Sequence, residues 1–197
     1  QNPTLFPAKF NLAATESRLG NVDKSNLLVE ELLSLSPQHN ETLMLKAFNL
    51  SKAGNLEEAK QIYLDILTLT PSNTGARERV SSLYQQQGDT KNALYHLDLL
   101  IKDDFDNADY LLRKAALQLE AGQRADAEKT LSIVRNFIND DAGKLIAYAD
   151  QARSVDNDEN ALDAMARAYE IANTSTFVTL RYVSLLLDMQ NNDKAQS

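Results

Sequence analysis

The side chains that most often carry catalysis or bind metals are scarce in this sequence. It contains two histidines, His39 and His96, and no cysteine. The histidines lie far apart along the chain, and neither has a Glu or Cys nearby at the spacing of a metal site. The sequence therefore predicts surface or edge positions for both histidines, with no bound metal and no cofactor.

Carboxylates are plentiful but do not form a recognisable site. They gather in two segments, Asp103 to Asp109 and Asp156 to Glu159. A calcium loop needs a glycine and regularly spaced oxygen ligands, and neither segment has both. Helix capping and solvation are the expected roles of these carboxylates. Because there is also no glycine-rich phosphate loop and no Ser/His/Asp grouping, the chain is not expected to be an enzyme.

Composition excludes further classes of function. The 197 residues include 20 Lys and Arg against 28 Asp and Glu, which gives a net charge of −8. Nucleic acid and anionic membrane surfaces are poor partners for such a chain, because both require a basic face. The longest apolar run is residues 145–149, too short to span a bilayer. The absence of cysteine is compatible with the cytosol and with a bacterial envelope alike.

The elements that carry these residues repeat along the chain. Gly20, Gly54, Gly88 and Gly122 are spaced by 34 residues, and so are Pro3, Pro37 and Pro71. Each glycine separates two stretches rich in Leu, Ala, Glu, Lys and Gln, with apolar residues at helical spacing. The pattern predicts helix hairpins that turn at the four glycines, at Asn157 and at Asn191, where Asn replaces the glycine.

Two columns of small residues follow the same period. Small side chains at a helix crossing let two backbones approach closely. The first column lies in the second helix of each hairpin and contains Ser25, Ala59, Ala93, Ala127, Ala161 and Ala195. The second lies in the first helix and contains Ala13, Ala47, Ser81, Ala115 and Ala149, with Val183 as the exception.

This 34-residue pattern resembles the tetratricopeptide repeat (TPR) family, most clearly at residues 43–71. The resemblance implies an all-α fold, a right-handed α-solenoid of antiparallel helix hairpins spanning 1–197. On this register residues 1–5 are the tail of a preceding repeat, and the chain is read as an excerpt of a longer protein. The repeats run 6–39, 40–73, 74–107, 108–141 and 142–175, with a partial repeat at 176–197.

In this family the first helices of successive repeats line a concave groove that takes a peptide or a helix. An apolar column is expected to form part of its floor, and arginines beside that column are suited to binding carboxylates. The residues expected to bind the partner are Phe10, Met44, Phe48, Arg79, Leu112, Arg113, Ile146, Leu180 and Arg181. Alternatively, the apolar side chains tilt into the core between helices and the arginines are simply solvated.

The expected function is therefore that of a non-catalytic scaffold for protein–protein interaction. Its partner would be another protein or peptide, amphipathic and acidic in character. The Leu- and Ala-rich repeats resemble those of bacterial envelope TPR proteins in secretion or surface-polymer export. This resemblance favours the bacterial periplasm or envelope slightly over the cytoplasm. The alternative is a regulatory or substrate-presenting module of an enzyme whose catalytic domain lies outside this sequence.

Overall fold

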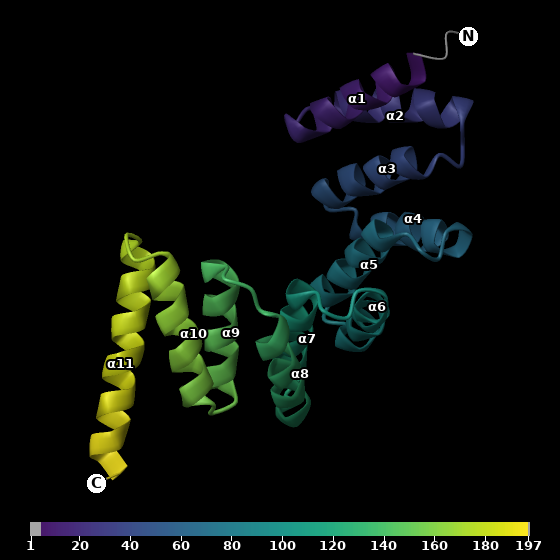
Figure 1. Ribbon diagram of the computed structural model, residues 1–197. Coiled ribbons are helices and arrows are strands. Elements are labelled where there is room, and N and C mark those ends of the chain that lie inside the picture. Colours follow the sequence, from purple (N-terminus) through teal and green to yellow (C-terminus); the bar gives the residue numbers. More distant parts are fainter. Residues whose placement is uncertain (1–4, 197) are drawn as a thin grey trace. The chain divides into compact units, whose positions relative to one another are not determined.

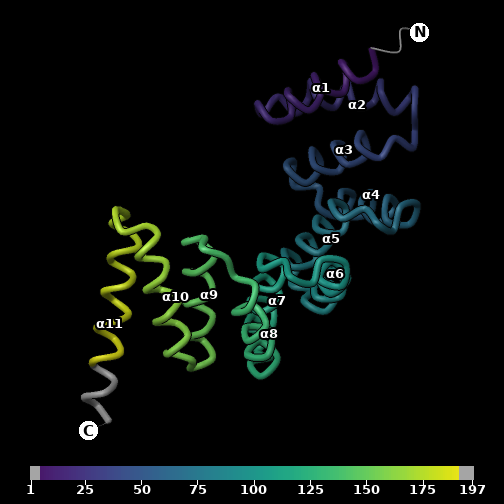
Figure 2. Tube along the Cα trace, viewed as in Figure 1, coloured from purple at the N-terminus to yellow at the C-terminus, as the bar shows by residue number. Residues whose placement is uncertain are grey.

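The computed structural model describes residues 5–196, and these contain eleven α-helices and no strand (Figures 1 and 2). Side chains are described as far as residue 190, so Pro3 and the Ala195 side chain lie outside the described residues. The helices are α1 (Leu5–Arg18), α2 (Val22–Leu35), α3 (Asn40–Lys52), α4 (Leu56–Leu69), α5 (Thr74–Gln86), α6 (Thr90–Asp103), α7 (Ala108–Glu120), α8 (Arg124–Phe137), α9 (Ala142–Ser154), α10 (Asp158–Ile171) and α11 (Thr176–Gln196).

The chain divides into two compact units, residues 1–96 and 97–197, and the division falls within α6. In unit 1, α1 packs on α2, α2 on α3, α3 on α4, and α4 on α5. In unit 2, α7 packs on α8 and α9, and α10 lies between α9 and α11 (Figure 1). Each unit is thus a succession of helices that contact their neighbours in sequence, as expected of a helical repeat.

The turns within the hairpins lie where the glycine spacing predicts them. Gly54 has a φ of 86°, and its backbone N–H donates to Ser51 O while that of Asn55 donates to Leu50 O. Asp156 occupies the same turn between α9 and α10 with a φ of 55°, next to the Asn157 that the sequence indicated. The same pair of hydrogen bonds follows there, from Asp156 N–H and Asn157 N–H. Asp tolerates the left-handed region better than most residues, so the turn survives the loss of glycine.

The two small-residue columns are confirmed as buried helix crossings. All members of both columns within the described side chains are almost inaccessible to solvent, apart from Val183 on α11, which is exposed. At the crossing of α5 and α6 the small residues also form a hydrogen bond. The hydroxyl of Ser81 donates to the backbone oxygen of Ala93 over 2.9 Å.

Polar side chains begin most of the first helices. Asn73 accepts from the backbone N–H of Ala76, and Asn107 accepts from those of Asp109 and Tyr110. Ser175 lies 3.5 Å from Val178 N at the start of α11. His39 caps α3, where its ring accepts from the N–H of Thr42, so the predicted edge position of His39 is confirmed.

Two sequence predictions are wrong. The turn expected at Asn191 is absent, because α11 continues from Thr176 to Gln196. This segment has no glycine, and an Asn inside a helix costs only about 0.7 kcal/mol or less, so the backbone stays helical. His96 is buried rather than on the surface, since its ring stacks on Tyr84 with centroids 5.7 Å apart and meets Tyr95 edge-on.

No helix in the described part of the chain combines the length and apolar character needed to cross a membrane.

Candidate functional site

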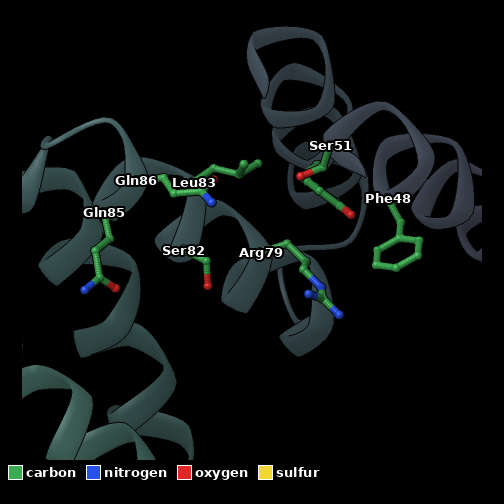
Figure 3. Close-up of a pocket in the computed structure, with 8 residues that line it drawn as sticks. Phe48, Ser51, Arg79, Ser82, Leu83, Gln85 and Gln86 are labelled. Carbon is green, nitrogen blue, oxygen red and sulfur yellow. The ribbon is translucent and has the colours of Figure 1, made fainter. Parts of the chain in front are cut away.

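A hollow of about 440 Å³ opens in unit 1 between α3, α4 and α5 (Figure 3). We call it the Arg79 hollow. Its walls are Phe48 and Ser51 from α3, Tyr63 from α4, and Arg79, Ser82, Leu83, Gln85 and Gln86 from α5. Ala47 next to Phe48 is fully buried, and its small side chain lets α3 and α4 approach closely.

Phe48 and Arg79 are the principal side chains of this hollow. Phe48 is half-buried against the core formed by α1, α2 and Leu45. The guanidinium carbon of Arg79 lies 5.6 Å from the centroid of the Phe48 ring, and Lys52 Nζ lies 5.3 Å from the same centroid. Figure 3 shows the Arg79 side chain extending from α5 towards this ring. One aromatic ring thus has two cations beside it.

The arrangement is suited to binding rather than to catalysis. Among the described residues, Arg79 forms no ion pair and has no carboxylate in the hollow, which leaves its guanidinium open to an anion. Tyr63 also lines the wall, and burial raises its pKa to about 12. A tyrosine with so high a pKa stays neutral at ordinary pH and cannot act as a general base.

Unit 2 contains a second hollow at the same repeat position, of about 250 Å³, which we call the Arg181 hollow. Its arginine, serine and leucine follow those of the Arg79 hollow by three repeats, as Arg181, Ser184 and Leu185. The position of Phe48 is taken there by Asp150. Asp150 forms an ion pair with Arg181, so this arginine already has an anion from its own chain.

The structure brings only some of the predicted partner-binding residues together. Phe48 meets Arg79, as the predicted groove requires. Phe10 and Met44 are half-buried, and each packs against one of the two unit 1 core clusters. These two residues therefore keep part of their surface exposed to solvent.

The predicted residues of unit 2 differ more from one another. Leu112 lies in the core with 6% of its surface exposed, so it offers a partner almost nothing. Ile146 is half-buried against the same core, and Leu180 is 64% exposed on α11. Arg113 is half-buried and already interacts within the chain.

Sequence reasoning missed Lys52 and Asp150. Lys52 could have been found from its place four residues after Phe48, which is one helical turn. Asp150 could have been found by aligning the two hollows at three times the repeat length. Within the described residues, no cluster of His, Asp and Glu is arranged to hold a metal ion.

Several solved structures resemble this chain. A thermophilic TPR protein of Thermus thermophilus superimposes with a TM-score of 0.64 at 24% identity, covering 92% of this chain and 99% of that one. MamA from Desulfovibrio magneticus RS-1 gives a TM-score of 0.72 at 13% identity, covering 87% and 97% of the two chains. YrrB, described as a TPR protein with an unusual peptide-binding site, gives 0.65 at 14% identity, covering 89% and 90%.

The chain has the TPR fold. This α-solenoid fold agrees with the helix hairpins, the glycine turns and the buried small residues described above.

A curated relative also contains TPR repeats. A TPR repeat-containing thioredoxin of Arabidopsis thaliana is 35% identical over 80 residues. The match covers 41% of this chain and only 12% of that protein, so the chain spans a small part of its length. No family model matches the chain.

Proposed function

We propose that this TPR chain is a non-catalytic scaffold that binds another polypeptide, and that the Arg79 hollow is one of its contact sites. The observation that carries the proposal is the unpaired guanidinium of Arg79 beside the half-buried Phe48 ring. An arginine and an aromatic ring at a helix-lined hollow are the residue types that dominate binding energy at protein interfaces.

The Arg181 hollow indicates what the partner supplies. There the chain places the Asp150 carboxylate on the arginine, from the position that holds Phe48 in the other hollow. The Arg79 hollow has the arginine without the carboxylate, so an Asp or Glu of a partner would complete it. An apolar side chain next to that acid would rest on Phe48, with Phe10 and Met44 extending the apolar surface within unit 1. The proposed partner is therefore an amphipathic, acidic peptide or helix.

The proposed setting is a bacterial secretion or surface-polymer export assembly, in which a TPR chain holds components together. A peptide-binding site in YrrB, which shares the fold, supports a polypeptide ligand. A second candidate is a regulatory or substrate-presenting module of an enzyme. Its support is the TPR repeat-containing thioredoxin, in which the matched segment is a small part of a longer protein.

Selection from a random peptide library displayed on phage tests the binding proposal. We expect wild-type protein to enrich peptides with Asp or Glu next to an aromatic or aliphatic residue. Phe48→Asp should abolish this enrichment, because it places a carboxylate on Arg79 as Asp150 does on Arg181. Arg79→Glu should abolish it as well.

The matched controls are exposed residues of unit 1 away from the hollow, Leu69→Asp and Lys24→Glu, which should leave the enrichment unchanged. Unchanged helical content and melting temperature would show that all four variants fold. Equal enrichment by wild type and Phe48→Asp would reject the Arg79 hollow as a peptide site.

A further inference from the structure

The turn between α6 and α7 exposes an aromatic side chain that packs against a second aromatic ring. Phe105 has 65% of its surface exposed, and its ring meets that of Phe137 edge-on with centroids 5.9 Å apart. Phe137, the last residue of α8, is itself half-buried against the core of unit 2. Phe105 is therefore held at the surface by packing from beneath.

The fold does not require an aromatic residue at this position. In earlier repeats the same place in the turn is held by Pro37 and Pro71. A large exposed apolar side chain gains nothing from burial, and it raises the risk of unwanted association. Its presence in this turn points to contact with another molecule.

The carboxylates around Phe105 do not all serve the helices. Asp104 accepts a hydrogen bond from the side-chain nitrogen of Asn107, the residue that caps α7. Asp103 ends α6 and Asp104 follows it, at the C-terminal end of a helix, where the dipole disfavours negative charge. Asp109 and Asp140 are paired with Lys144 at 2.8 Å and Arg167 at 2.8 Å respectively.

The ion pairs of the described residues leave Asp103 and Asp106 without a cation. The turn thus combines an apolar anchor with unneutralised negative charge. The net charge of −8 on the chain opposes a second copy and an anionic membrane as occupants of such a surface.

We propose that Asp103, Phe105, Asp106 and Phe137 form a docking site, the acidic edge, for a cationic amphipathic segment of another protein. An apolar side chain of that segment would pack on the two phenylalanine rings, and Lys or Arg beside it would pair with Asp103 and Asp106. Ile171 occupies the position equivalent to Phe137 in the next repeat, and 46% of its surface is exposed. It would extend the apolar part of the acidic edge. This inference goes beyond the proposed function, because the site lies in the other unit and selects a partner of the opposite charge.

The test uses the whole chain and a fluorescent synthetic amphipathic helix made of Leu and Lys, with binding followed by anisotropy. Phe105→Ser and the double change Asp103→Asn with Asp106→Asn should each weaken binding about tenfold. Matched controls are Leu27→Ser, at an equally exposed apolar residue, and the double change Glu128→Gln with Asp163→Asn, at exposed acids of unit 2. Both controls should retain the wild-type Kd within about twofold.

Two comparison peptides separate the apolar and the charged contributions. A peptide of Ser and Lys with the same charge, and one of Leu and Glu with the same apolar face, should both bind at least about tenfold more weakly. The proposal is overturned if Phe105→Ser binds as wild type does, or if the controls lose as much affinity as the edge variants. Because every one of these residues lies outside the Arg79 hollow, failure here leaves the peptide selection on that hollow unaffected.

Discussion

The hydroxyl of Ser17 on α1 donates a hydrogen bond to the side-chain oxygen of Asn49 on α3 over 2.5 Å. The amide nitrogen of Asn49 donates in turn to Ser25 Oγ and Asn26 Oδ1, both at 2.8 Å. Asn49 is 1% exposed, and the two serines are fully buried. In the next two repeats the position of Asn49 is held by Leu83 and Leu117. One asparagine thus replaces an apolar contact with a closed polar network joining three helices.

Removing this network should destabilise unit 1 strongly. Asn49→Ala leaves the buried hydroxyls of Ser17 and Ser25 with fewer partners and opens a cavity. We expect the free energy of unfolding to fall by about 2–4 kcal/mol. Asn11→Ala, on the exposed face of α1, should cost less than about 0.5 kcal/mol. Urea unfolding of the two variants beside wild type decides the matter, and equal midpoints would contradict the prediction.

Enlarging a helix crossing should also be costly. Ala127 is fully buried on α8, and a leucine there must displace packed neighbours, so Ala127→Leu should cost about 1–3 kcal/mol. Ala93→Leu should behave alike on α6. The adjacent Glu128 is exposed, and Glu128→Leu provides the control. Thermal melts that show no difference between the variants at 127 and 128 would mean that the crossing has spare volume.

Two glycines should respond in opposite ways to the same substitution. Gly54 has a φ of 86° with open space around a new Cβ, so Gly54→Ala should cost about 1–2 kcal/mol through the backbone alone. Gly75 lies inside α5 without a positive φ, and a Cβ there would lie 3.3 Å from the flexible end of Met44. Gly75→Ala should therefore be neutral or stabilising by up to about 1 kcal/mol. A lower melting temperature for Gly75→Ala than for Gly54→Ala would contradict this order.

Stability should fall as the pH drops below neutrality, partly because of His96. Burial lowers the pKa of His96 below its usual 6.5, and the charge of Arg77 lowers it further. As the pH falls, His96 of the unfolded chain takes up a proton near pH 6.5. In the folded chain His96 takes up its proton only at a lower pH. The contribution of His96 is therefore complete above pH 6.5 and declines as the pH falls towards the lower pKa of the folded state.

His96→Gln removes this difference between the folded and unfolded chains. Its free energy of unfolding should decline less than that of wild type between about pH 7 and about pH 5. Urea titrations at a series of pH values measure both slopes. Identical slopes would show that His96 does not contribute to the acid sensitivity.

The regular part of the fold could be predicted from the sequence because it depends on local backbone rules and on volume. Gly54 requires a left-handed φ, and Ala93 or Ala127 must be small, so both leave a periodic signature. The continuation of the helix through Asn191 could not be predicted, because Asn permits a turn without requiring one. The burial of His96 escaped notice because it depends on two neighbouring tyrosines, Tyr84 and Tyr95, rather than on the repeat.

The candidate site could be predicted only where neighbouring repeats bring the same columns together. Phe48 and Arg79 lie in adjacent first helices, so their contact follows from the register. The burial of each side chain does not follow from the repeat register. Leu112 and Leu180 share one column, but Leu112 is in the core of unit 2 and Leu180 is exposed on α11. The side chains that pack against each residue of the column decide how much of its surface is exposed.

The two hollows share an arginine, a serine and a leucine but differ at three other columns. Phe48, Ser51 and Tyr63 of the Arg79 hollow correspond to Asp150, Arg153 and Met165 of the Arg181 hollow. Of these differences, only Phe48 and Asp150 decide whether the arginine already has a carboxylate. The residues that decide what each hollow binds are therefore different from those that both hollows share. This separation makes the chain a good subject for engineering. Exchanging Phe48 and Asp150 should transfer the vacant arginine from unit 1 to unit 2 with the helix crossings untouched. A library confined to this column would vary what each hollow accepts without redesigning the helices that form it.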